Sequence, residues 1–169
     1  MGCVAAVEKL EDDVKIKTRF NKDAVEVGQF DGDHFSGTRV IGEIVEHGNF
    51  TSGCLMEGVR ISPTITEFGV FDPISKKLIR GRILTDSQIS IGEFSNILIR
   101  GKIIKFSGKI IEGTFADGKL TNGFKYFSNG EIEEGEFKDG QLVEGSKTLV
   151  KKTKITGKFK NKKFIGSKI

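Results

Sequence analysis

The C-terminal segment of this 169-residue chain holds its densest group of residues with a chemistry of their own. Residues 146–169 contain nine lysines and no acidic residue, whereas residues 1–60 carry a net charge of −4 and residues 61–145 a net charge of −1. Seven lysines fall within thirteen positions: Lys151, Lys152, Lys154, Lys158, Lys160, Lys162 and Lys163. Ammonium groups at this density indicate a surface for an anionic partner.

Three interpretations of this lysine cluster stay open. An anionic membrane would attract it with about 1 kcal/mol for each surface lysine. A protein partner is also compatible, whereas nucleic acid is disfavoured because arginine and exposed stacking aromatics are lacking in this segment. On the third interpretation, the lysines keep a terminal strand from pairing with another chain. Alternate residues of a strand share a face, so we expect Lys152 with Lys154, and Lys158 with Lys160, to project in pairs.

The N-terminus offers a second chemistry, covalent lipidation. Once the initiator methionine is removed, Gly2 would be an N-terminal glycine open to myristoylation, with Cys3 beside it for palmitoylation. Two acyl chains anchor a protein stably, whereas one binds only marginally. However, Ala6 stands where the myristoylation motif has Ser or Thr, and the acidic residues of segment 8–13 would be repelled by anionic lipid. An acylated start and an ordinary start both remain open.

The remaining reactive side chains do not form a catalytic pattern. His34 and His47 are the only histidines, and no third ligand or nucleophile is spaced to join them. The two cysteines are 51 positions apart, which is no metal-site spacing, and Cys54 is expected to be a small filler residue. Neighbouring acids such as Glu133 and Glu134 point to opposite faces of a strand. We therefore expect no enzyme, no metal and no cofactor.

The elements that position these residues are set by a repeat. Gly113 is followed by Phe115, Gly118, Leu120 and Gly123, and the same offsets recur 22 residues later. Seven such units can be counted, with leading glycines 20 to 23 residues apart, a period that signals a repeat array. These leading glycines, which we expect to be structural, are Gly28, Gly48, Gly69, Gly92, Gly113, Gly135 and Gly157.

Each unit is predicted to be a β-hairpin. Phe, Ile, Val and Thr flank the glycines, and Asp117-Gly118 and Asp139-Gly140 lie between apolar runs, a strong hairpin signal. A glycine inside a strand costs about 0.5–1 kcal/mol relative to alanine. Its recurrence therefore indicates either an aromatic ring lying over the bare backbone or a bend in the strand. A bulge at the turns would flip the alternation, so the two faces cannot be assigned from the sequence.

Two segments, EGTFADGKLTNG (112–123) and EGEFKDGQLVEG (134–145), resemble the MORN repeat (membrane occupation and recognition nexus). They have the family's glycine, the aromatic residue two positions later, and the Asp/Asn-Gly turn. The repeats depart from the family in two ways. Two residues before the leading glycine, where typical members have Tyr, this chain has Ile111, Glu133 and Ile155, and each repeat has one closing glycine in place of Gly-x-Gly. The resemblance, to a divergent array, implies an elongated sheet of hairpins with a scaffold or membrane-associated role and no catalysis.

The predicted fold class is all-β: an elongated, single-layer, twisted antiparallel sheet of about seven consecutive β-hairpin repeats. Residues 1–24 are assigned to an N-terminal arm and a capping strand, and residues 25–169 to the repeats. Within the arm we expect a short helix over 4–10 and the capping strand over 14–20.

We expect a non-enzymatic scaffold for protein–protein interaction, cytoplasmic or peripheral at a membrane. The alternative is a peripheral lipid-binding module that uses the C-terminal lysines and an acylated N-terminus. No secretory segment and no apolar run of 18 residues occur, so neither a signal peptide nor a transmembrane helix is expected. Homo-oligomerisation, the identity of the partner and the sheet face that binds it are left open.

Overall fold

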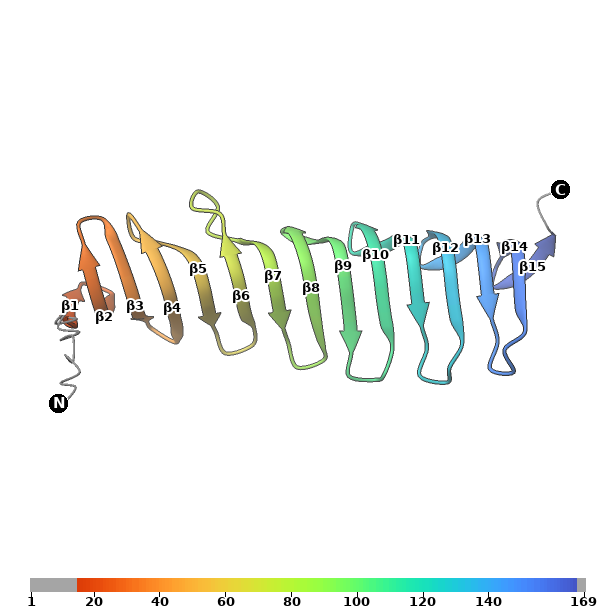
Figure 1. Ribbon diagram of the computed structural model, residues 1–169, viewed down its shortest axis with the longest axis horizontal. Coiled ribbons are helices and arrows are strands. Elements are labelled where there is room, and N and C mark those ends of the chain that lie inside the picture. The colour runs from red at the N-terminus through yellow and green to blue at the C-terminus, as the bar shows by residue number, and fades with distance from the viewer. Residues whose placement is uncertain (1–14, 167–169) are drawn as a thin grey trace, which may run out of the picture.

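The computed structural model describes residues 15–166 and places fifteen β-strands in one antiparallel sheet. The spatial order of the strands is their order in the chain, so the sheet is an open, elongated array with β1 and β15 at opposite ends (Figure 1). The described residues contain no helix. The prediction of an all-β, single-layer sheet of consecutive hairpins is confirmed. The strands are β1 (Lys17–Asn21), β2 (Ala24–Asp31), β3 (His34–Ile41), β4 (Ile44–Thr51), β5 (Cys54–Ile61), β6 (Thr66–Phe71), β7 (Leu78–Leu84), β8 (Gln88–Ser95), β9 (Ile97–Lys105), β10 (Ile110–Ala116), β11 (Lys119–Tyr126), β12 (Ile132–Lys138), β13 (Gln141–Thr148), β14 (Lys154–Lys160) and β15 (Lys163–Gly166).

The seven hairpins β2–β3, β4–β5, β6–β7, β8–β9, β10–β11, β12–β13 and β14–β15 coincide with the seven repeats counted in the sequence. β1 precedes them and pairs with β2, which places a strand where a capping strand was predicted. Gly2, Cys3 and the helix expected over 4–10 lie outside the described residues.

Thirteen glycines form one continuous row across the sheet. Within a hairpin the leading glycine lies opposite the closing one, as Gly113 does opposite Gly123. Between hairpins, Gly113 also lies opposite Gly101, the closing glycine of the preceding unit. The row consists of Gly28, Gly37, Gly48, Gly58, Gly69, Gly81, Gly92, Gly101, Gly113, Gly123, Gly135, Gly145 and Gly157.

These glycines are required because neighbouring backbones approach one another too closely for a side chain. A Cβ atom on Gly113 would lie 2.0 Å from the carbonyl oxygen of Asn122 and 2.9 Å from the Cα atom of Gly123. The φ angle of Gly113 is 148°, which L-residues rarely adopt. An aromatic ring is a secondary obstacle: at Gly37 the ring of Phe35 would lie 2.9 Å from the added atom, but the carbonyl oxygen of Val27 would lie at 2.3 Å.

The strands also bend at this row and fold the sheet into a trough. Arg39 lies directly opposite Glu46, yet its guanidinium donates a hydrogen bond to the carbonyl oxygen of Gly53, at 2.6 Å. Gly53 lies seven residues beyond Glu46 in the chain. If the strand were straight, Gly53 would be on the order of 20 Å from Glu46, and hence from the backbone of Arg39 opposite it. That distance is far beyond the reach of one arginine side chain. The two halves of each strand therefore face each other across the glycine row.

The hydrophobic core fills this trough as a single line of rings and leucines. Its buried members are Phe35, Phe50, Leu55, Phe71, Leu78, Phe94, Leu98, Phe115, Leu120, Phe137, Leu142 and Phe159. Six of the seven hairpins contain a register shift near the tip, such as the one beside Phe115. This β-bulge brings Leu120, three residues before Gly123, onto the same face as Phe115. The β2–β3 hairpin shows no such shift, and there Phe35 precedes Gly37 by two residues.

Candidate functional site

A row of charged residues lies on the inner face of the trough, two positions from the glycines. In the N-terminal half, arginine and glutamate alternate on successive strands, each opposite the next: Arg19, Glu26, Arg39, Glu46, Arg60 and Glu67. This Arg/Glu ladder was missed in the sequence. Aligning the repeats on both glycines would have revealed it, since the acid stands two residues before the leading glycine and the arginine two residues after the closing one.

Glu46 is the centre of this ladder and is only 4% exposed. It accepts hydrogen bonds from Nε of Arg39 at 2.9 Å and from Nε of Arg60 at 2.8 Å. Each arginine also donates to a carbonyl at the tip of the next hairpin, Arg39 to Gly53 and Arg60 to Lys76. Burial opposes ionisation of Glu46, but the hydrogen bonds and charges of the two arginines outweigh it and lower the pKa of the carboxyl group. The network thus ties consecutive repeats together.

Lys125 occupies the equivalent position in the C-terminal half, directly opposite Glu133. Its Nζ donates to the carbonyl oxygen of Gly140 at the next hairpin tip and lies 4.3 Å from the centre of the Phe137 ring. The side chain is 5% exposed. Burial lowers the pKa of Lys125, and the charge of Lys109 lowers it further. Lys125 therefore acts as a clamp between repeats, as the two arginines do.

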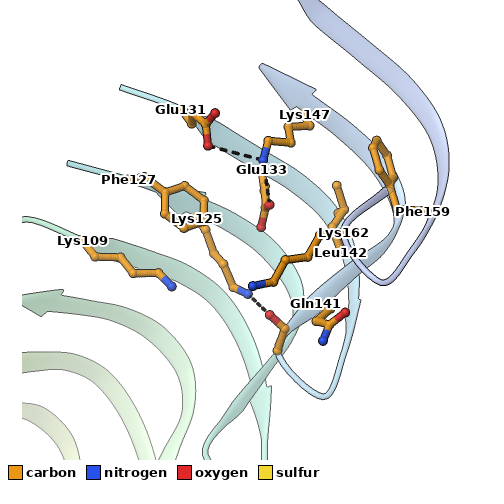
Figure 2. A pocket seen from close by; sticks show the side chains of 11 residues that line it. Lys109, Lys125, Phe127, Glu131, Glu133, Gln141, Leu142, Lys147, Phe159 and Lys162 are labelled. Carbon is orange, nitrogen blue, oxygen red and sulfur yellow. Dashed lines mark hydrogen bonds and ion pairs between the residues drawn. The ribbon is translucent and has the colours of Figure 1, made fainter. Parts of the chain in front are cut away.

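Beside Lys125 lies a cavity of about 280 Å³, which we call the lysine pocket (Figure 2). Four lysines and two glutamates line it together with apolar side chains: Lys109, Lys125, Lys147, Lys162, Glu131, Glu133, Phe127, Leu142 and Phe159. Lys147 is neutralised, since its Nζ lies 3.3 Å from Glu131 and 3.7 Å from Glu133. The other three ammonium groups point toward one another (Figure 2). No carboxylate of residues 15–166 lies within 4 Å of them.

The structure disperses the C-terminal lysine cluster instead of keeping it on one surface. Lys151 and Lys152 lie in the link between β13 and β14, and Lys163 lies on β15. Lys152 has a φ of 62° in that link, so the prediction that it shares a strand face with Lys154 is wrong. Lys162, in the tip of the last hairpin, joins the lysine pocket.

Three lysines of the cluster, Lys154, Lys158 and Lys160, lie on β14. Lys158 and Lys160 are both exposed and flank the buried Phe159, so they share one face as predicted. That face is the outer one, turned away from the trough that Phe159 fills. Lys154 lies on the outer face too, 3.7 Å from the carboxylate of Glu134.

The other candidate residues form no centre among the described parts of the chain. His34 contacts Thr51 at 3.2 Å, and His47 contacts Thr38 at 2.9 Å. No group of three His, Cys, Asp or Glu residues within 15–166 is arranged to hold a metal ion. Cys54 is a half-buried free thiol. Glu133 contacts Lys147 in the trough whereas its neighbour Glu134 contacts Lys154 outside, so the predicted opposite orientation of this acidic pair is confirmed.

The outer face carries an apolar row three positions from the glycines. From β1 to β12 its members lie opposite one another, and Thr66 is the only one without an apolar or aromatic side chain: Phe20, Val25, Val40, Val45, Ile61, Thr66, Leu84, Ile89, Ile104, Ile110, Tyr126 and Ile132. Phe20 is 79% exposed and Ile61 44%. Val25, Val40 and Leu84 are exposed as well, and the other members are half-buried. A partly exposed apolar row of this length tends to mark an interaction surface.

The molecule is thus an open repeat array of β-hairpins with a charged, ring-lined trough on one face and an apolar row on the other. Comparison with known proteins finds no matching family model and no matching curated protein. Within residues 15–166, no helix is long and apolar enough to cross a bilayer.

Proposed function

We propose that this protein is a non-enzymatic scaffold of the MORN-repeat type that binds a protein partner in the cytoplasm along the outer face of its sheet. The observation that carries the proposal is the apolar row of that face. It crosses twelve strands, on the order of 50 Å at a strand spacing of about 4.8 Å. In layered folds such a sheet face is covered by helices, and an amphipathic helix of about 30 residues has this length.

Charges beside the apolar row indicate what such a helix should carry. On β7 and β9 the outer face presents Arg80, Arg82, Arg100 and Lys102. Glu93 on β8 lies between Arg80 and Arg100, so the basic side chains outnumber the acidic ones on these three strands. A partner helix with acidic residues beside its apolar stripe would complement this region, and electrostatic complementarity fixes orientation and register.

Site-specific photo-crosslinking tests the proposed surface. Phe68 lies on the outer face beside the apolar row, two positions from Thr66 on β6, and is 43% exposed. Ile74 is 91% exposed in the β6–β7 hairpin tip. With a benzophenone amino acid at either position in the native host, we expect the probe at Phe68 to capture a protein segment and the probe at Ile74 to capture none. Mass spectrometry of the adduct should identify an amphipathic sequence flanked by acids.

The captured segment then serves as a synthetic peptide for affinity measurements. Phe68→Glu should weaken its binding by tenfold or more, because the new carboxylate would lie in the apolar contact. The matched control Ile74→Glu, also an exposed apolar residue, should bind as wild type. Crosslinking from the hairpin tip alone, or equal binding by both variants, would contradict an outer-face scaffold.

The alternative function is a peripheral lipid-binding module, favoured by the exposed Lys158 and Lys160 on the outer face of β14. If these lysines bind anionic lipid, replacing Lys158, Lys160, Lys162 and Lys163 with Gln should reduce vesicle co-sedimentation and flatten its salt dependence, with little change in melting temperature. If they protect the terminal strand, the same variant should bind lipid like wild type but aggregate more readily. Retained lipid binding with unchanged aggregation would contradict both roles.

A further inference from the structure

We propose that the lysine pocket is a receptor for a phosphate monoester carried on a side chain of a polypeptide, so that the array recognises a phosphorylated partner. The inference deepens the scaffold function and rests on it only in taking the partner to be a protein. It comes from Lys109, Lys125 and Lys162, which are far apart in the sequence and which the bent sheet brings around one cavity (Figure 2).

The charges of the pocket are unbalanced at one place. Both of its glutamates are engaged with Lys147 at one end, which leaves the ammonium groups of Lys109, Lys125 and Lys162 to face one another. Burial has the largest effect on the pKa of Lys125 and lowers it; the charges of Lys109 and Lys162 lower it further, against the opposing charge of Glu133. An anion placed among them would remove this repulsion, and the apolar walls of Phe127, Leu142 and Phe159 would strengthen the attraction.

The number of donors fits a phosphate group better than a carboxylate. A phosphate monoester carries a charge of about −1.5 to −2 near neutral pH and three acceptor oxygens. Each ammonium group has three N–H donors, and Lys125 spends one on the carbonyl oxygen of Gly140. The cavity volume of about 280 Å³ holds such a group together with part of the side chain that bears it.

The position of the pocket favours a polypeptide over a bilayer as the source of the phosphate. The pocket lies in the trough, where Lys125 is only 5% exposed beneath the hairpin tip of Gly140. The lysines that a flat membrane would meet at this end, Lys158 and Lys160, are on the opposite face of β14 from Phe159. A bilayer lying on those lysines does not reach the pocket, whereas a phosphorylated side chain that enters between the hairpin tips and the opposite wall of the trough does.

The test uses the full chain and a short capped peptide with one phosphoserine flanked by glycines. Binding is measured by calorimetry, and the pKa of Lys125 by NMR of its side-chain signals. We expect the phosphopeptide to bind, its unphosphorylated form to bind at least tenfold more weakly, and the pKa of Lys125 to rise on binding. Lys109→Gln with Lys162→Gln should weaken the phosphopeptide tenfold or more. This variant spares the clamp made by Lys125, so its fold is retained.

Two controls decide the outcome. Lys158→Gln with Lys160→Gln removes two charges from the outer face and should leave phosphopeptide binding unchanged. Vesicles containing phosphatidic acid or phosphatidylinositol 4-phosphate provide the same phosphate chemistry on a membrane. Loss of vesicle binding in the Lys109/Lys162 variant, without phosphopeptide binding by wild type, would overturn the proposal in favour of a lipid headgroup. Equal binding of both peptides, or of neither, would overturn it outright.

These experiments test the scaffold function and the phosphate site independently. Crosslinking from Phe68 reports on the outer face and does not depend on Lys109 or Lys162. If the wild-type protein does not bind the phosphopeptide but the probe at Phe68 still captures a partner, only the phosphate site is refuted. A functional pocket without any crosslink at Phe68 would refute only the outer-face scaffold.

Discussion

Gly113→Ala is expected to lower the free energy of unfolding by about 2–6 kcal/mol. The added Cβ would lie 2.0 Å from the carbonyl oxygen of Asn122, and that atom belongs to the backbone of a paired strand and cannot rotate away. Overpacking of this kind costs about 1–3 kcal/mol. The φ of 148° adds a further cost of about 1–3 kcal/mol for any residue with a side chain. Urea unfolding followed by circular dichroism measures the loss.

Gly166 offers a matched control for this substitution. Its φ is also 148°, but nothing lies within 4 Å of a Cβ built on it. Gly166→Ala should therefore show the conformational cost alone, about 1–3 kcal/mol, and Gly166 lies in the last strand, β15, where fraying reduces even that. Equal losses at the two positions would show that backbone strain, and not close approach of the strands, explains the regular recurrence of glycine in this chain.

Glu46→Gln is expected to lower stability by about 3 kcal/mol at neutral pH. The substitution leaves the guanidinium groups of Arg39 and Arg60 without their shared carboxylate, and removing one partner of a buried ion pair costs about 3–5 kcal/mol. The lower end applies because the two arginines keep some contact with water, with side-chain exposures of 11% and 19%. Thermal and urea unfolding at low and high salt measure the effect.

The pH dependence of this loss identifies its electrostatic origin. The folded-state pKa of Glu46 lies below the ordinary value of 4.5. Its contribution is therefore fully present above pH 4.5 and disappears as the pH falls through the lowered pKa. The stability difference between wild type and Glu46→Gln should shrink over that acidic range. A difference that stays constant with pH would contradict the assignment to the ionised carboxylate.

A surface pair supplies the comparison for Glu46. Glu112 lies 2.9 Å from Lys102 on the outer face, and both side chains are more than a third exposed, at 45% and 40%. Exposed ion pairs contribute about 0–1 kcal/mol, so Glu112→Gln should change stability by less than 1 kcal/mol. If Glu112→Gln lowered the free energy of unfolding as much as Glu46→Gln, burial of Glu46 in the trough would not explain its contribution to stability.

Local features of the sequence were sufficient to predict the repeat and its strands. The Asp117-Gly118 and Asp139-Gly140 turns fix hairpins by their backbone preferences alone, and the glycine spacing fixes their number. The Arg/Glu ladder is also present in the sequence, two residues from the glycines, but the pattern of glycines and rings that defines the repeat does not include it. Arg39 follows the closing glycine of one repeat, and its partner Glu46 precedes the leading glycine of the next repeat. This part of the site could therefore have been predicted from the sequence.

The assignment of residues to faces was decided only by the tertiary structure. The bulge beside Phe115 shifts the alternation by one residue and brings Leu120 to the core face, and it arises from the pairing of two strands. The seven C-terminal lysines are close in sequence, but the link at Lys152 and the hairpin tip at Lys162 separate them onto different surfaces.

What the sequence by itself determined is therefore the array: its hairpins, their number and their order. The trough and the lysine pocket come from the tertiary structure, because they depend on the bend at the glycine row. Lys109, Lys125 and Lys162 meet only when the strands fold at Gly123 and its neighbours in the row and the hairpin tips approach the opposite wall. Contacts between residues so distant in the chain are fixed by backbone packing across many strands, and no local propensity specifies them.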